Sequence, residues 1–272
     1  MRQGQGLGGF LLLALLFVSA PAALAHTFWL VPHGSRAAVG EQVAFDLRIG
    51  SDLPGTRTGR LPGLVDTFTL FDSEGARPIG GRESAAPVGH VRVRGPGAAI
   101  AALFTLAHTS TLTPQDLDRY IEEEALETQL PGWRGRTGGR AQFIDRFSRC
   151  AKSVILVGRS SRGFDRVAGL PFELIPLTDP LAAFAAPSRA GTYELRLLLQ
   201  KQPVAGHWVK ARLTGGERVE IKTQTDARGI ARFELPRPGL WLFDTVHIAP
   251  AASLDADLES LWASLTVEIA PP

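Results

Sequence analysis

Residues 42–49 (QVAFDLRI) decide the fold class, because their apolar and polar side chains alternate along the chain. The apolar side chains, which share one face of an extended segment, are Val43, Phe45, Leu47 and Ile49. Such alternation is typical of a β-strand with one buried face. The turn-forming residues 50–52 (GSD) follow at once. The segment therefore predicts a strand that ends in a turn.

Short apolar runs of the same kind recur along most of the chain, and Gly, Pro, Ser and Asp separate them. In the first half they are residues 28–31, 65–71, 90–93 and 100–106. In the second half they are residues 193–199, 208–213, 219–223, 230–235, 240–248 and 265–269. Many short strands with turn residues between them are typical of antiparallel β-sandwiches. We therefore expect a mainly β protein with two antiparallel sandwiches, Ig-like or transthyretin-like, over residues 26–187 and 188–272.

The middle of the chain predicts a short helical segment inserted in the first domain. Residues 113–116 (TPQD) combine an N-cap Thr, a Pro at the first helical position and an acidic residue two positions later. Apolar residues then recur at helical spacing until Pro131-Gly132, which predicts the stop. Residues 141–152 predict a second helix and residues 153–157 a strand. Residues 176–188 (PLTDPLAAFAAPS) are the expected linker between the domains.

The N-terminal residues predict a secretory signal peptide over residues 1–25. Arg2 precedes an apolar run at residues 10–18, and residues 23–25 (ALA) give the small-x-small pattern that signal peptidase reads. Cleavage there makes His26 the first residue of a periplasmic or secreted protein. The alternative is an uncleaved anchor, although a spanning helix needs about 20 apolar residues. No later stretch has that length, so we expect no membrane span after removal of the leader.

The composition excludes several classes of function. The chain has 29 basic and 27 acidic residues, and loss of the leader removes only Arg2 from this balance. This near-neutral balance gives no reason to expect nucleic-acid binding. Cys150 is the only cysteine, which excludes an internal disulfide, and Met1 is the only methionine. Serine-hydrolase, zinc-peptidase and phosphate-loop motifs are missing from the sequence, so we expect no catalytic residues and no enzyme activity.

Histidines carry the remaining chemical signal. Cleavage before His26 exposes an α-amino group beside an imidazole, and these two nitrogens can chelate one metal ion. Their reference pKa values, about 7.7–8.0 and about 6.5, allow both groups to lose a proton near neutral pH. Nitrogen donors suit Ni(II), Co(II), Cu(II) and Zn(II), whereas Cu(I) prefers the thioethers that the mature chain lacks.

We expect further metal ligands from His247 and His108. His247 lies on a predicted strand, and His108 lies at the end of another, just before the predicted helix. Each of them also fits a surface or hydrogen-bonded structural histidine, and spacing in the sequence does not establish proximity. The remaining histidines, His33, His90 and His207, resemble exposed residues of loops, strands or turns.

Six segments spread along the mature chain share the motifs of one family. They are residues 26–32 (HTFWLVP), 40–50 (GEQVAFDLRIG), 120–126 (YIEEEAL), 169–180 (GLPFELIPLTDP), 240–248 (LWLFDTVHI) and 262–265 (WASL). Together they resemble periplasmic proteins of the domain-of-unknown-function family numbered 4198. Ala125 stands where the family usually has Gly in its Y-L-x-E-E-G-L helix.

The resemblance implies a periplasmic component linked to nickel or cobalt uptake, with a membrane metal transporter as partner. Many members of the family have no assigned function. His26 and His247 fall on motif positions of the family, and His108 does not. The second domain also resembles carboxypeptidase-regulatory or transthyretin-like sandwiches through residues 203–206, 225–229 and 239–241.

The resulting hypothesis is a periplasmic binding protein for a divalent transition metal, nickel or cobalt first, with His26, His247 and His108 as ligands. Copper(II) and zinc are the other ions that fit these donors. One alternative is a structural or adhesive sandwich protein of the cell envelope that binds no metal. A third candidate is a copper oxidase in which an N-terminal histidine brace holds the ion.

Overall fold

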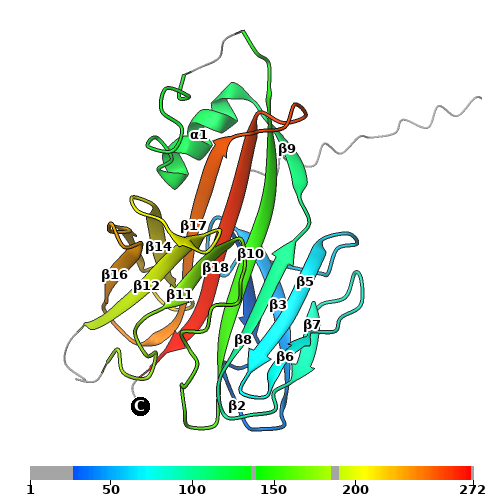
Figure 1. Cartoon of the computed structure of the whole chain (residues 1–272), viewed down its shortest axis with the longest axis vertical. Coiled ribbons are helices and arrows are strands. Elements are labelled where there is room, and N and C mark those ends of the chain that lie inside the picture. Colours follow the sequence, from blue (N-terminus) through cyan, green and yellow to red (C-terminus); the bar gives the residue numbers. More distant parts are fainter. Residues whose placement is uncertain (1–26, 136–138, 185–189, 271–272) are drawn as a thin grey trace, which may run out of the picture.

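The computed structural model describes residues 27–135, 139–184 and 190–270 (Figure 1). The predicted signal peptide and His26 lie outside these residues. The strands, in chain order, are β1 (Thr27–Pro32), β2 (Arg36–Ala37), β3 (Gln42–Gly50), β4 (Thr56–Thr58), β5 (Val65–Asp72), β6 (Gly75–Pro78), β7 (Gly89–Arg92), β8 (Gly97–Thr105), β9 (His108–Leu112), β10 (Phe143–Val157), β11 (Phe172–Pro176), β12 (Gly191–Leu199), β13 (Gln202–Pro203), β14 (Trp208–Leu213), β15 (Glu220–Gln224), β16 (Ile230–Leu235), β17 (Gly239–Pro250) and β18 (Leu258–Ile269). The helix is α1 (Pro114–Glu124). Among the described residues, no helix has the length and apolarity that a membrane span requires.

A ten-stranded sheet runs through the whole molecule in the order β15-β14-β17-β18-β10-β8-β5-β6, and β2 and β9 also pair with β10. The long strands β10, β17 and β18 form its centre (Figure 1). β10 and β18 run parallel from the pair Asp145 and Leu258 to the pair Ser153 and Thr266. This sheet therefore joins the first and second halves of the chain through main-chain hydrogen bonds.

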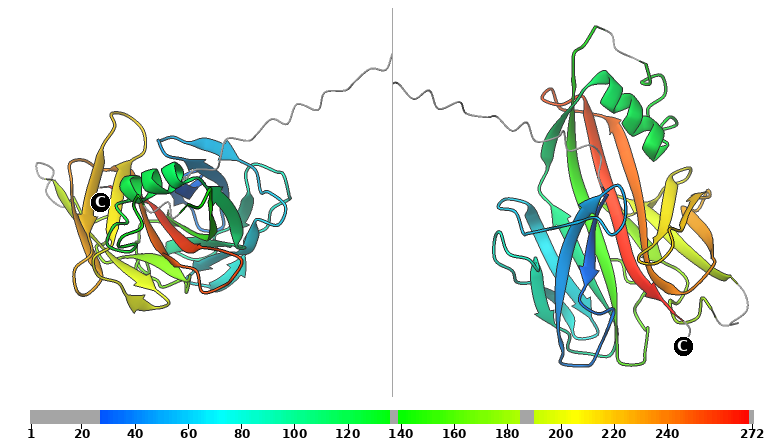
Figure 2. Two further views of the ribbon diagram at one scale, coloured as in Figure 1. Left: turned by 90° about the horizontal axis from the view of Figure 1, so that it is seen from above. Right: turned by 180° about the vertical axis from the view of Figure 1, so that it is seen from behind.

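The expected mainly β fold with a short helical segment is confirmed, but the sheets do not form two separate sandwiches. Instead, the two faces of the central sheet carry different layers. One face packs against the sheet of β1, β3, β4 and β7 and against α1, and the other face packs against the sheet of β11, β12, β13 and β16. Seen from above in Figure 2, the long strands lie between the blue N-terminal strands and the yellow-green strands of the second half.

The expected boundary near residues 187 and 188 falls between β11 and β12. These two strands are antiparallel neighbours in one sheet, with Leu174 opposite Leu197. β11 therefore shares its sheet with strands of the second half. The exact division of the chain into domains stays a prediction.

The prediction of a second helix over residues 141–152 is wrong, because residues 143–152 belong to β10. The helical signal came from Phe143, Phe147 and Ala151, which are spaced four residues apart. Such spacing puts side chains on one face of a helix, but it also puts them on one face of a strand. Pairing with β9 and β18 decides between the two.

The predicted start of α1 is confirmed. The backbone N–H of Asp116 donates to the Thr113 hydroxyl, and the Asp116 carboxylate accepts from the Thr113 backbone, which forms a capping box. The helix ends before the expected stop at Pro131-Gly132, because Ala125 adopts the left-handed conformation with φ 53° and ψ 53°. Its N–H caps the helix by donating to the carbonyls of Glu122 and Ile121. Glycine adopts the left-handed conformation without a steric cost, which explains why the family that the sequence resembles usually has Gly at this position.

We expect Ala125→Gly to raise the free energy of unfolding by about 0.5–1 kcal/mol. The left-handed conformation costs an L-residue about 1–2 kcal/mol, and the greater chain entropy of unfolded glycine removes part of the gain. Urea denaturation measures the change. Glu123→Gly is the matched control, because it places glycine inside the helix and should destabilise by about 1 kcal/mol. Equal losses in both variants would contradict the prediction.

Candidate metal centre

Two imidazoles face each other where the loop before β14 meets β17. Nε2 of His207 lies 3.1 Å from Nδ1 of His247. The two rings stack, with centroids 5.4 Å apart and an angle of 24° between their planes. The structure thus gives the predicted ligand His247 a histidine partner that comes from a distant part of the chain.

Neighbouring groups hold the two rings in place. The backbone N–H of His207 donates to the hydroxyl of Thr225 over 3.0 Å, and the N–H of Thr225 donates back to the His207 carbonyl over 2.9 Å. Phe172 packs against both rings, with centroid distances of 6.2 Å to His207 and 6.0 Å to His247. These contacts hold the pair between the central sheet and β11, with His207 buried and His247 half-buried.

The hydrogen bonds indicate which nitrogens are available to a metal ion. Nδ1 of His207 lies 3.3 Å from the Ala205 carbonyl, which can only accept a hydrogen bond. With the proton on Nδ1, the lone pair of Nε2 points at His247. A backbone carbonyl that orients a ligand histidine in this way is common at metal sites. To bind the same ion, His247 would shift its proton from Nδ1 to Nε2.

Both imidazoles favour the neutral form. Burial lowers the pKa of His247 to about 4, and the adjacent His207 ring contributes to this shift. Burial also lowers the pKa of His207, although the Ala205 carbonyl opposes this effect. Two neutral imidazoles at pH 7 can bind a cation without first releasing bound protons.

The separation of the facing nitrogens matches that of two ligands on one ion. Imidazole nitrogens bind zinc at about 2.0–2.1 Å. At a bond angle between roughly 90° and 109°, two such nitrogens lie about 2.9–3.4 Å apart. The observed 3.1 Å between His207 and His247 falls inside this range. A shared ion would therefore need a change of proton position and small ring rotations rather than a rebuilt site.

His247 also lines an open cleft of about 520 Å³ on the same face of the central sheet. The cleft lies between residues of the first half and the turn after β12. Its charged residues are Asp66, Arg146 and Glu259, and its other lining residues are Phe104, Thr105, Leu106, Ala107, Ser148, Pro171, Leu199, Gln200 and Leu261. A mostly apolar cleft with a few convergent polar groups is typical of ligand sites.

The structure does not bring His108 to His247. His108 is opposite Phe147 in the pairing of β9 with β10, and its ring lies 6.0 Å from that of Phe147. Phe147 packs in the core beneath α1, whereas His247 lies on the other face of the central sheet. Nε2 of His108 is buried and has no hydrogen-bond partner among the described residues.

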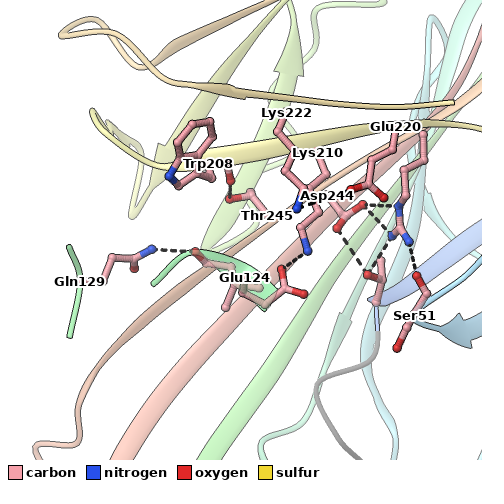
Figure 3. A network of polar contacts seen from close by, with 12 residues as sticks. Ser51, Glu124, Gln129, Trp208, Lys210, Glu220, Lys222, Asp244 and Thr245 are labelled. Atoms are coloured by element: carbon pink, nitrogen blue, oxygen red, sulfur yellow. Dashed lines mark hydrogen bonds and ion pairs between the residues drawn. The ribbon is translucent and has the colours of Figure 1, made fainter. Parts of the chain in front are cut away.

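His26 lies outside the described residues, so its predicted role as a ligand stays a prediction. Its neighbour Thr27 is buried, and the Thr27 hydroxyl accepts a hydrogen bond from Nη2 of Arg212 over 2.9 Å. The same hydroxyl lies 3.4 Å from a carboxylate oxygen of Asp244. Figure 3 shows this network, which also contains Ser51 and the ion pair of Lys210 with Glu124. Asp244 alternates with His247 along β17 and therefore points to the opposite face.

The sequence predicts an exposed strand or turn position for His207, but the residue is only 7% exposed. It lies 40 positions before His247, and no motif joins the two.

The other two histidines remain apart from the pair. Nε2 of His33 lies 3.0 Å from a carboxylate oxygen of Asp46, and His90 is exposed on β7. Across the described ranges, no group of three or more His, Cys, Asp or Glu residues is arranged to hold a metal ion.

Comparison with known proteins confirms the family resemblance. The sequence model of the family described as "Domain of unknown function (DUF4198)" matches residues 23–249. No curated protein matches the chain. Among solved structures, the D0-D1 domain of Intimin is 11% identical, with a TM-score of 0.23, and the match covers 88% of this chain and 97% of that one. A tetra-tandem repeat in the extending region of a large adhesion protein is also 11% identical, with a TM-score of 0.21 and coverage of 90% and 50%. Likenesses at these TM-scores carry no argument about function.

Proposed function

This chain belongs to the DUF4198 family, and we propose that it is a β-sheet protein of the cell envelope that binds one divalent transition metal ion between His207 and His247. The observation that carries this proposal is the 3.1 Å separation of their facing nitrogens beside an open cleft. His26 is not needed for this site, because both nitrogen donors belong to described residues.

The chemistry of the donors favours a divalent ion. Imidazole nitrogens suit Ni(II), Co(II), Cu(II) and Zn(II). The thiolate that Cu(I) would use is not accessible, because Cys150 is buried and burial raises its pKa to about 12. The preference for nickel or cobalt, the role in uptake and delivery to a membrane transporter are supported by the family resemblance alone.

A second candidate function is a structural or adhesive module of the envelope that binds no metal. The continuous ten-stranded sheet favours it, because main-chain pairing along this sheet joins the first and second halves of the chain. This function requires only the fold, and two imidazoles in hydrogen-bond contact are also a stable structural pair. The copper oxidase is a third candidate, and it requires a ligand at residue 26.

Titration of metal-free protein with Ni(II), Co(II) and Zn(II) tests the proposal. We expect a rise in melting temperature, because an ion present at 100 times its Kd stabilises a fold by about 2.7 kcal/mol. His207→Ala, His247→Ala and the more conservative His247→Gln should each weaken binding by about 100-fold in calorimetry. His90→Ala removes an exposed imidazole far from the pair and should bind as the parent protein does.

The two leading candidates predict opposite results. A metal-free structural module predicts no shift in melting temperature with any of the ions. Binding that survives unchanged in both His207→Ala and His247→Ala would place the ion elsewhere and would also reject the proposed site. Circular dichroism of each variant separates a lost ligand from a lost fold.

A further inference from the structure

The His207–His247 pair is incomplete as a metal site. A transition metal ion of this class binds at least four ligands in most protein sites. The described residues offer two imidazoles and no third protein ligand in position. If the proposed function holds, the remaining ligands therefore come from outside the described residues, through the cleft that His247 lines.

The cleft can admit more than water. Its volume of about 520 Å³ lies within the range of about 300–1,000 Å³ that is usual for small-molecule sites. Phe104, Leu106, Leu199 and Leu261 supply apolar walls. Such walls displace water and strengthen charge interactions inside the cleft.

Arg146 gives the cleft an anion-binding group. It is exposed on β10, and no ion pair in the described part of the chain includes it. A guanidinium can bind a carboxylate through two parallel hydrogen bonds. Arg146 and His247 line the same cleft, so one small molecule between them could touch both the ion and the guanidinium.

From this arrangement we propose that the ion is bound as a complex with a small carboxylate chelator. The two imidazoles bind two positions of the metal, the chelator binds the others, and Arg146 binds a carboxylate of the chelator. This inference rests on the proposed function, because it needs the metal between His207 and His247.

The two acidic residues of the cleft favour the metal-bound chelator over the metal-free chelator. Glu259 lies opposite Arg146 in the parallel pairing of β10 with β18, and Asp66 lies at a register shift of β5. Both carboxylates repel a free polycarboxylate anion. A bound divalent cation cancels two negative charges of the chelator, so the complex meets less repulsion than the empty chelator. Attraction to one species and repulsion of its competitor together give specificity.

Native mass spectrometry and calorimetry with citrate as the probe test this inference. Metal-free protein is mixed with Ni(II) alone, with citrate alone, and with preformed nickel citrate. We expect a ternary species with one nickel and one citrate, and no complex with citrate alone. Arg146→Gln should weaken nickel citrate binding by about 10-fold and leave binding of Ni(II) alone unchanged.

Glu259→Gln is the matched control, since it removes the opposite charge from the same part of the cleft. It should bind nickel citrate at least as tightly as the parent protein. A nickel-loaded protein that binds no citrate, or an Arg146→Gln variant with parental affinity for nickel citrate, would overturn the inference and leave the His207–His247 site standing. Absence of nickel in every arm would overturn both proposals.

Discussion

Replacement of Glu173 by Gln will lower the free energy of unfolding by about 3–5 kcal/mol, because it leaves the charge of Lys152 buried without a counterion. The two side chains are each 1% exposed, and Nζ of Lys152 lies 2.7 Å from Oε1 of Glu173. Burial lowers the pKa of Lys152, and Glu173 counteracts this shift. Guanidinium denaturation measures the loss.

Glu173 also binds the loop that precedes β11. Its carboxylate accepts hydrogen bonds from the backbone N–H groups of Ala168, Gly169 and Leu170 at 2.7 Å, 2.9 Å and 3.2 Å. The amide of a Gln side chain accepts through one atom only, so at least one of these three donors loses its partner. This arrangement gives a physical reason for the G-L-P-x-E-L motif of the family.

Two controls separate this effect from a general cost of mutation. The double variant Lys152→Met/Glu173→Gln removes both charges and should be more stable than Glu173→Gln alone. Arg232→Gln breaks an exposed contact with Glu194, where the arginine side chain is 63% exposed, and should cost no more than about 1 kcal/mol. A loss of under about 1 kcal/mol in Glu173→Gln would show that the buried pair does not stabilise the fold.

Strands with one buried face were predictable from the sequence, and pairing between distant strands was not. The alternation around Phe45 matches β3, and the cap at Thr113 matches the start of α1. The parallel pairing of β10 with β18 joins residues more than 100 positions apart and leaves no local pattern. The apolar residues at 143, 147 and 151 fit a helix and a strand equally well, so only the tertiary structure could decide.

Of the two histidines in the candidate site, the sequence predicts only His247 as a ligand. His247 was expected as a ligand because it lies on a predicted strand and on a family motif. His207 was expected to be exposed, since a polar residue beside Gly206 resembles a turn, but Phe172 and the loop at Thr225 bury it. Burial of a polar residue depends on partners that lie elsewhere in the chain, and hydropathy of the segment itself does not reveal them. The buried pair of Lys152 and Glu173 escaped prediction for the same reason.

Replacement of Arg212 by Met will cost about 3–5 kcal/mol, because it leaves Asp244 as a buried charge without its counterion. Arg212 is 5% exposed and Asp244 is 1% exposed. Nε and Nη2 of Arg212 both donate to one oxygen of Asp244, at 3.1 Å and 2.7 Å. The same guanidinium donates to the Thr27 hydroxyl at 2.9 Å and to the Ser51 carbonyl at 2.7 Å. Loss of the guanidinium therefore loosens both β1 and the loop after β3 from the central sheet. Hydrogen exchange of the β1 amides measures this effect.

Thr27→Val is the matched control, because it removes the hydroxyl that contacts Arg212 and Asp244 and keeps the ion pair between those two residues. It should cost about 1 kcal/mol. If Arg212→Met costs no more than Thr27→Val, then the buried charge pair does not stabilise this junction.

The pH dependence of the Arg212→Met variant distinguishes lost charge compensation from lost packing. Burial raises the pKa of Glu124 above its usual value, Asp244 raises it further, and Lys210 and Arg212 oppose both effects. An acid whose pKa is raised by folding lowers stability above its unfolded pKa, and this penalty disappears as the pH falls below that value. Removal of Arg212 strengthens the penalty, since one opposing positive charge is gone. The difference in stability between the parent protein and Arg212→Met should therefore be larger at pH 7 than at pH 4. A difference that stays constant across this range would assign the effect of Arg212 to packing of its side chain rather than to its charge.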